Sequence, residues 1–338
     1  MISTRGSYLF FPGIEGPSVK LIIQIPCFNE ETTLPAVIHD LPRELPGVDC
    51  IEYLVIDDGS TDRTVEVARE LGVHHILRQR GNGGLARAFS AGIQACLEHG
   101  ADIIVNTDGD NQYKASCIGE LIRPILENSL DIVVGARPIE TIEHFSWHKK
   151  LLQRWGSQVV RSLSGTDVPD TTSGFRAYSA DAAMQIQVFN PYTYTLETII
   201  QAGHMRMRIG SVPIEVNDKT RESRLISSIP QYILRSTAIM LRTYVMYKPL
   251  KTFLYLSIWP LLVGLILCLR FLYYYFFTDH SSGKVQSLIL ATTLLIVGFI
   301  LITLGLVADL ISANRRLLQE LRYRISAERY RRHKEGQE

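Results

Sequence analysis

Three short apolar segments in the first third of the chain end in acidic residues, and this pattern constrains the fold more than any other feature. The segments are 19–25, 51–56 and 103–105. Short apolar runs that end at turn residues, with helical segments between them, are typical of buried strands in a parallel sheet. Ligands of such sheets bind beyond the carboxyl ends of the strands. The sequence therefore predicts an α/β domain with a doubly wound, mainly parallel sheet and a cleft lined by carboxylates.

The third segment leads into an acidic turn formed by Asp108, Gly109 and Asp110, with Gln112 two residues further on. Two carboxylates this close repel each other unless a cation lies between them. Mg²⁺ and Mn²⁺ prefer hard oxygen ligands and are usually held by one or two carboxylates together with substrate phosphates. Taken alone, the motif is equally compatible with a solvated Asp-Gly turn. The acids at the other two strand ends favour a binding cleft.

Composition excludes several classes of protein. Lys and Arg number 35 against 34 Asp and Glu, and a net charge of +1 gives no argument for binding nucleic acid. The five cysteines are scattered without a CxxC pair, which indicates a reducing compartment and neither a disulfide framework nor a zinc site. The glycine run at 81–84 is not GxGxxG, and no Walker A motif occurs, so a dehydrogenase or a P-loop enzyme is disfavoured.

Composition changes near residue 250, where two stretches without charges begin. They span 253–269 and 288–308 and lack the polar face that a soluble core helix normally shows. Each is long enough, or nearly so, to cross about 30 Å of hydrocarbon. The linker 278–284 is short, so the two stretches are predicted to form a transmembrane hairpin. Two buried helices of a soluble domain are the alternative.

Basic residues flank this hairpin on both sides, with lysines before it and arginines after it. The positive-inside rule then places both termini and the α/β domain in the cytoplasm of an integral membrane protein. The predicted division of the chain is a leader at 1–18, the α/β domain at 19–225, juxtamembrane amphipathic helices at 226–250, the hairpin at 251–312 and a basic cytoplasmic tail at 313–338.

Five motifs occur in an order that resembles the family-2 glycosyltransferases of the GT-A fold. They lie at Ile25–Glu30, Val55–Asp62, Gly81–Gly84, Asp108–Tyr113 and Thr172–Phe175. More narrowly, the chain resembles the polyprenyl-phosphate glycosyltransferases, which are similar to dolichol-phosphate mannosyltransferase. Bacterial members with a C-terminal transmembrane hairpin fit best. The resemblance implies a Rossmann-like, mainly parallel sheet for the catalytic domain.

The resemblance also implies which residues bind the nucleotide-sugar donor and the metal. The residues implied to contact the base, ribose and diphosphate of the donor are Pro26, Phe28, Glu30, Asp58, Asp108, Gly109 and Lys149. The residues implied to hold Mg²⁺ or Mn²⁺ against the donor diphosphate are Asp108, Asp110 and Gln112.

The resemblance also implies a second set of residues, which bind the acceptor phosphate or take part in catalysis. A basic loop with Lys219, Arg221 and Arg224 resembles the site of the acceptor phosphate, although Arg221 occupies a position where glycine is common. The residues implied to act in catalysis are Asp110, Arg137 and Asp170, with Glu197 as a minor rival to Asp170. A lipid phosphate is already anionic near neutral pH and needs little deprotonation. Whether Asp170 takes a proton or orients other groups is therefore open.

The predicted function is inverting, metal-dependent transfer of one sugar to undecaprenyl or dolichyl phosphate at the cytoplasmic membrane face. UDP-glucose is the favoured donor, while GDP-mannose, UDP-galactose and UDP-N-acetylglucosamine stay open. One alternative is a processive polysaccharide synthase, but Gln153, Arg154 and Trp155 have the wrong spacing for its QxxRW motif. A non-catalytic membrane scaffold is another alternative. Gly298 and Gly305 would permit close helix packing and a homo-oligomer through the spans.

Overall fold

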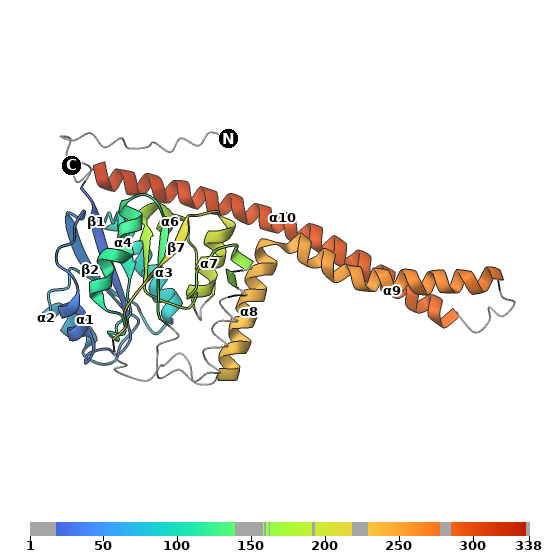
Figure 1. Cartoon of the computed structure of the whole chain (residues 1–338), viewed down its shortest axis with the longest axis horizontal. Helices are drawn as coiled ribbons and strands as arrows, with labels where there is room; N and C mark the ends of the chain where they lie inside the picture. Colours follow the sequence, from blue (N-terminus) through green and yellow to red (C-terminus); the bar gives the residue numbers. More distant parts are fainter. Residues whose placement is uncertain are drawn as a thin grey trace. The chain divides into compact units, whose positions relative to one another are not determined.

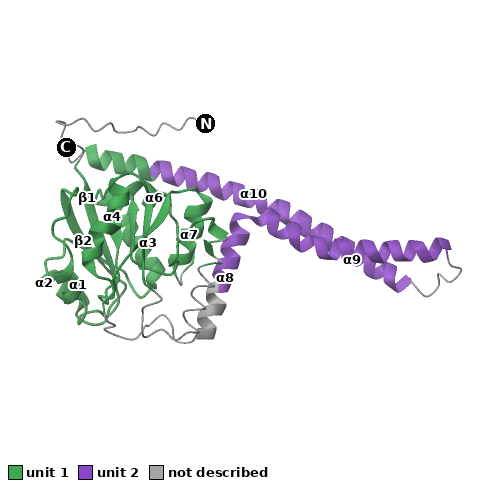
Figure 2. Ribbon diagram, in the orientation of Figure 1, with its two compact units in different colours: residues 1–225, 326–338 green, residues 226–325 purple. Residues whose placement is uncertain are grey.

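The computed structural model describes residues 18–138, 158, 160–161, 163–190, 193–217, 229–277 and 285–335 (Figure 1). The chain divides into two compact units, shown in Figure 2. Unit 1 consists of Met1–Leu225 together with Ser326–Glu338, and unit 2 consists of Ile226–Ile325. The C-terminal end of the last helix therefore belongs to the same unit as the N-terminal part of the chain.

Unit 1 is built on a seven-stranded sheet with the order β3-β2-β1-β4-β6-β5-β7. β6 runs antiparallel to both of its neighbours, and the other pairs are parallel, so the predicted mainly parallel sheet is confirmed. The strands are β1 (Lys20–Cys27), β2 (Cys50–Asp57), β3 (His75–Arg78), β4 (Ile103–Asn106), β5 (Ile132–Ala136), β6 (Arg176–Ser179) and β7 (Ile209–Pro213).

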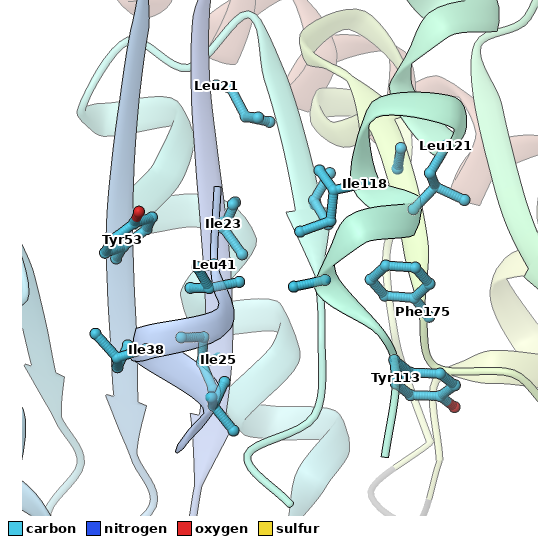
Figure 3. Close-up of a cluster of buried hydrophobic side chains, with 14 of the residues drawn as sticks. Leu21, Ile23, Ile25, Ile38, Leu41, Tyr53, Tyr113, Ile118, Leu121 and Phe175 are labelled. Carbon is cyan, nitrogen blue, oxygen red and sulfur yellow. The ribbon is translucent and has the colours of Figure 1, made fainter. Parts of the chain in front are cut away.

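Helices cover both faces of this sheet, because alternate residues of each buried strand point to opposite faces. Leu21, Ile23 and Ile25 of β1 pack with residues of α1 and α4 on one face, whose core is shown in Figure 3. Ile22 packs with residues of α3 and α6 on the other face. The helices of unit 1 are α1 (Leu34–Asp40), α2 (Thr64–Glu70), α3 (Leu85–Glu98), α4 (Ile118–Leu126), α6 (Ala180–Gln185) and α7 (Thr195–His204), with a short 3₁₀ turn at Ala115–Cys117.

Unit 2 is helical and contains α8 (Ile229–Tyr247), α9 (Pro249–Phe277) and most of α10 (Val285–Glu335). α9 and α10 are long and apolar enough to cross a membrane, and only 11% of the most apolar window of each is buried. Trp259 is 72% exposed and Phe299 is 67% exposed. Core helices of a soluble domain would bury such side chains, so this exposure favours contact with lipid.

Small residues bring α9 and α10 close together within unit 2. A side-chain carbon at Gly298 would lie 2.5 Å from Leu261, and one at Gly305 would lie 2.9 Å from Cβ of Phe253. Both glycines therefore serve packing inside one chain. The homo-oligomer predicted from these glycines gains no support from this packing and stays a prediction.

Within unit 1, the end of α10 contacts the residue that precedes β4. The hydroxyl of Tyr330 donates to Oδ1 of Asp102 at 2.8 Å, and Nζ of Lys334 lies 2.6 Å from Oδ2 of the same carboxylate. Asp102 directly precedes β4. The segment predicted as a basic tail is thus helical as far as Glu335, and its last turns contact the start of a central strand.

Candidate active site

The sheet topology brings the predicted site residues of the described chain to one edge. β1, β2, β4 and β5 all end at this edge, and the antiparallel strand β6 begins there. Glu30, Asp58, Asp108 and Arg137 follow the four parallel strands, and Asp170 precedes β6. Residues from five separate segments therefore border one region, as expected for a ligand site of an open α/β sheet.

The acidic turn beyond β4 packs directly on the end of β1. A side-chain carbon at Gly109 would lie 3.1 Å from Sγ of Cys27, so glycine allows the turn to approach this closely. Asp108, Asp110 and Gln112 are half-buried. Oδ1 of Asp110 accepts a hydrogen bond from the backbone N–H of Gln112 at 3.2 Å, which fixes the shape of the turn.

The donor set of this turn fits a divalent cation that is shared with a substrate. The described residues contain no group of three or more His, Cys, Asp or Glu side chains that could hold a metal by themselves. Mg²⁺ and Mn²⁺ do not need such a cage, because they usually take one or two carboxylates and complete their shell with phosphates and water. Asp108 and Asp110 could supply the two carboxylates.

Glu30 lies beside the acidic turn and is buried. The hydroxyl of Thr33 is 2.7 Å from Oε2 of Glu30 and 2.8 Å from the carbonyl oxygen of Gly109, so it links the segment after β1 to the acidic turn. Pro26 is the penultimate residue of β1, and Phe28 follows the strand and is half-buried. The roles of these residues toward a nucleotide stay predictions.

Asp58 has a structural role that its sequence motif does not reveal. Its Oδ1 accepts from the N–H of Gly83 at 2.9 Å, and its Oδ2 accepts from the N–H of Gly84 at 2.8 Å. Gly59 has a φ of +79°, and a side-chain carbon there would lie 2.7 Å from the backbone of Gly81. Asp58 and Gly59 therefore hold the glycine loop against the end of β2. A contact of Asp58 with base or ribose stays a prediction.

Arg137 and Asp170 form a buried ion pair across the β5 and β6 ends. Nε of Arg137 donates to Oδ2 of Asp170 at 2.7 Å, and one terminal nitrogen donates to Oδ1 at 3.1 Å. The same nitrogen donates to the hydroxyl of Thr172 at 2.8 Å, and this hydroxyl donates to Asp170 at 3.0 Å. The side chains of Arg137 and Asp170 are 13% and 1% exposed. We call these three residues the Arg137–Asp170–Thr172 cluster.

The electrostatics of this cluster keep Asp170 ionised. Burial alone would raise the pKa of its carboxyl, but the charge and hydrogen bonds of Arg137 outweigh burial, so the pKa is lower than the ordinary value. A carboxylate with a low pKa and a bidentate arginine partner is a poor proton acceptor near neutral pH. The geometry therefore supports an orienting role for Asp170.

Gly174 is held by a network that sequence reasoning missed. Its N–H donates to the hydroxyl of Tyr113 at 3.1 Å, and its carbonyl accepts from Asn106 at 2.9 Å and from the hydroxyl of Tyr194 at 3.2 Å. A side-chain carbon at Gly174 would lie 3.3 Å from both carboxylate oxygens of Asp108, so this loop borders the acidic turn. One signal was available, since Asn106 is a polar residue at the end of a buried strand.

Burial raises the pKa of both tyrosines in this network. The pKa of Tyr113 rises to about 12, and that of Tyr194 rises well above its ordinary value, with the charge of Asp108 adding to the effect of burial at Tyr194. Both hydroxyls therefore stay protonated at neutral pH and act as neutral hydrogen-bonding groups.

Glu197, the minor rival to Asp170, makes hydrogen bonds that support the local fold. Its side chain is buried, and Oε2 accepts from the backbone N–H groups of Phe189 and Asn190 at 3.1 and 3.0 Å. These bonds tie the preceding loop to α7. The remaining predicted cations, Lys149, Lys219, Arg221 and Arg224, lie outside the described residues, and their roles stay predictions.

Comparisons with known proteins show to which family the chain belongs. Residues 22–187 match the family described as Glycosyl transferase family 2. Polyprenol monophosphomannose synthase of Mycolicibacterium smegmatis is 25% identical over 62% of this chain and 81% of its own length. Undecaprenyl-phosphate mannosyltransferase of Micrococcus luteus is 28% identical over 62% of this chain and 89% of its own. UDP-N-acetylglucosamine–dolichyl-phosphate N-acetylglucosaminyltransferase of Methanococcus voltae is 30% identical over 58% of this chain and 85% of its own.

Among solved structures, glucosyl-3-phosphoglycerate synthase from Mycobacterium tuberculosis in complex with Mn²⁺, UDP-glucose and phosphoglyceric acid is similar. It has a TM-score of 0.53 and 20% identity over 68% of this chain and 79% of that chain. This likeness shows that the chain has a fold of the GT-A type. The chain belongs to glycosyltransferase family 2, as the order of its motifs predicted.

Proposed function

We propose that this glycosyltransferase transfers one sugar from a nucleotide-sugar donor to a polyprenyl phosphate. The observation that carries the proposal is that one chain combines the acidic turn of a GT-A site with two exposed apolar helices long enough to cross a membrane. A polyprenyl tail lies in the bilayer, so an enzyme that uses it must work at a membrane. The names of the three relatives all describe sugar transfer to such lipids.

The chemistry needs a single displacement. An oxygen of the lipid phosphate bonds to C1 of the sugar while the bond from C1 to the donor diphosphate breaks, so the nucleoside diphosphate leaves and the configuration at C1 inverts. Asp108 and Asp110, with Gln112, would hold the divalent cation. When bound, this cation would neutralise charge on the leaving diphosphate.

The remaining residues of the site bind and orient the two anionic substrates. In the proposal, Pro26, Phe28, Glu30 and Asp58 border the base and ribose, directly or through the glycine loop. Arg137, oriented by Asp170, presents positive charge to a phosphate, and Lys149 with the basic loop at 219–224 adds to it. The lipid phosphate has a second pKa of about 6 and is a competent nucleophile at pH 7, so no strong general base is required.

Mannose is the sugar that we propose to test first. The resemblance of the sequence favours UDP-glucose, but two of the three relatives are named for mannose and one for N-acetylglucosamine. GDP-mannose is therefore placed ahead of UDP-glucose, UDP-N-acetylglucosamine and UDP-galactose.

A donor panel tests the proposal. The full-length protein in detergent or liposomes is given each radiolabelled donor with undecaprenyl or dolichyl phosphate, and with Mg²⁺, Mn²⁺ or EDTA. The expected result is one labelled lipid that forms only with the polyprenyl phosphate and is lost with EDTA. A labelled polymer would show a processive synthase, and donor binding without any lipid-dependent transfer would show a scaffold. Either result would overturn the proposal.

We also propose that both termini face the cytoplasm and that the linker 278–284 faces the opposite side. Lysines and arginines flanking the two apolar helices support this orientation. With Ser281→Cys in a background without other cysteines, a membrane-impermeant thiol reagent should label intact cells from outside. Labelling only after the cytoplasmic side is exposed would contradict this orientation.

A further inference from the structure

Arg176 is a fully buried arginine whose partners among the described residues are all uncharged. It is the first residue of β6, and its side chain is 0% exposed. The guanidinium donates to the carbonyls of Ser173 at 2.8 Å, Thr171 at 3.0 Å and Thr195 at 3.0 Å, and to the hydroxyl of Thr198 at 2.7 Å. Burying a charge is costly unless many strong hydrogen bonds replace water. These four bonds meet that need.

The four acceptors come from two different segments of the chain. Thr171 and Ser173 belong to the loop 170–174, and Thr195 and Thr198 belong to the first turn of α7. The planar guanidinium therefore ties this loop to α7. A lysine ammonium at this position could not reach the same four acceptors, because it is a compact group on a flexible stem.

The loop has a second side, which faces the active site. The carbonyls on both sides of Thr172 accept from Arg176, whereas the N–H and the hydroxyl of Thr172 donate to Asp170 at 3.2 and 3.0 Å. The same hydroxyl accepts from Arg137. Arg176 fixes the orientation of the peptide groups on both sides of Thr172. This orientation therefore determines how the N–H and the hydroxyl of Thr172 contact Arg137 and Asp170.

We propose that Arg176 is a positioning residue that holds the loop 170–174 and thereby orients the Arg137–Asp170–Thr172 cluster toward the phosphate of a substrate. Arg176 is buried away from substrates and acts through Thr172. The proposal rests on the proposed function for its activity readouts, and a readout of loop structure tests it separately.

The first test compares Arg176→Lys with a matched control, Arg208→Lys. Arg208 also makes several hydrogen bonds, to Asp131 and Asn128, but it precedes β7, at the edge of the sheet opposite the site. We expect Arg176→Lys to lower kcat by about 10- to 100-fold, as misplacement of a positioned group does, with little change in donor KM. Arg208→Lys should stay within about twofold of wild type. Equal activity of the two variants would overturn the proposal.

The second test asks whether Arg176 acts through Thr172. Thr172→Val is measured alone, with Arg176→Lys and with Arg208→Lys. Residues that act as one unit give non-additive effects. We expect Thr172→Val to cost at least about fivefold less in the Arg176→Lys background than in wild type, and the same in the Arg208→Lys background as in wild type. If the effects of the single variants on kcat multiply in both double variants, to within about twofold, the proposal is contradicted.

Hydrogen exchange of the peptide that covers 170–175 gives a readout without activity. The N–H groups of Thr172 and Gly174 are hydrogen-bonded in the structure. Arg176→Lys should speed exchange in this peptide and leave the peptides of β1 and β2 protected. Unchanged exchange in the 170–175 peptide would overturn the proposal. Equally faster exchange in this peptide and in the peptides of β1 and β2 would also overturn it. If the wild type transfers no sugar, the proposed function fails and this measurement still decides the role of Arg176.

Thr198→Val provides a milder variant in case Arg176→Lys does not fold. It removes the Thr198 hydroxyl, which lies on α7 outside the loop and accepts a hydrogen bond from the guanidinium of Arg176. We expect the same direction of change in kcat and in exchange of 170–175, with a smaller size. A fully normal Thr198→Val beside an unfolded Arg176→Lys would show that Arg176 serves the fold alone and would overturn the proposal.

Discussion

The two sides of the candidate site are built differently. The acidic turn with Asp108 and Asp110 is half-buried, and its backbone is held by Oδ1 of Asp110 and by the side chains of Thr33 and Asn217. The loop with Asp170 is buried, and side chains from three other segments hold it. The acidic turn therefore keeps carboxylates accessible to a cation and a diphosphate. Several hydrogen bonds fix the loop, as expected for groups that must be held in place.

This difference in burial predicts opposite outcomes for substitution of Asp170 and Asp110. The largest effect is expected at Asp170, on stability. Asp170→Ala leaves the buried guanidinium of Arg137 without its charged partner, so we expect a loss of about 3–5 kcal/mol in the free energy of unfolding. Chemical denaturation in detergent measures this loss. The control Asp167→Ala removes a carboxylate whose side chain is 97% exposed and should change little. Equal stability of the two variants would show that the buried pair is unimportant.

At the acidic turn, Asp110→Ala should spare the fold and remove activity. Loss of one charge-assisted contact to the cation is expected to cost about 3 kcal/mol in the transition state, or about a hundredfold in rate. The transfer assay with saturating Mg²⁺ or Mn²⁺ measures it, and unchanged thermal melting serves as the control. Near-normal transfer would exclude Asp110 from the cation site.

The pH dependence of Asp170→Asn sharpens the comparison further. Because the pKa of Asp170 is lowered in the folded protein, its stabilising contribution is present above the pKa of the unfolded carboxyl, about 3.9, and is lost only as the pH falls through the lower folded value. Asp170 therefore does not titrate between pH 5 and 8. The acid limb of the rate, near pH 6, should belong to the acceptor phosphate and persist in Asp170→Asn.

For this variant we expect the acceptor KM to rise more than kcat falls. A fall in kcat of more than about a hundredfold, together with disappearance of the acid limb, would show that Asp170 takes a proton.

The sequence predicted the acidic side of the site better than the buried side. Asp108, Gly109 and Asp110 follow a short apolar strand, and a local pattern of this kind is visible in sequence. The mainly parallel sheet was predicted for the same reason. β6 was not, because Arg176–Ser179 is a short strand that reads RAYS and has no run of apolar residues. The loop before β6 reaches the site only because that strand runs antiparallel.

Long-range hydrogen bonds account for most of what the sequence did not reveal. Asn106 and Tyr194 are 88 residues apart, and their shared contact with Gly174 depends on how α7 packs on the sheet. Arg176 reads as an ordinary polar residue until its four neutral acceptors are known. Asp58 belongs to a recognised motif, yet its bonds to the glycine loop depend on the close approach of two turns.

The most direct test of the account is a Mn²⁺ titration followed by electron paramagnetic resonance, with and without GDP or UDP. The central claim is that Asp108 and Asp110 hold a divalent cation together with the donor diphosphate. We predict tight Mn²⁺ binding to the wild type only when a nucleoside diphosphate is present, loss of this binding in Asp110→Ala, and its retention in Asp170→Asn. Equal Mn²⁺ binding by the wild type and Asp110→Ala, or none by the wild type with either nucleotide, would contradict the account.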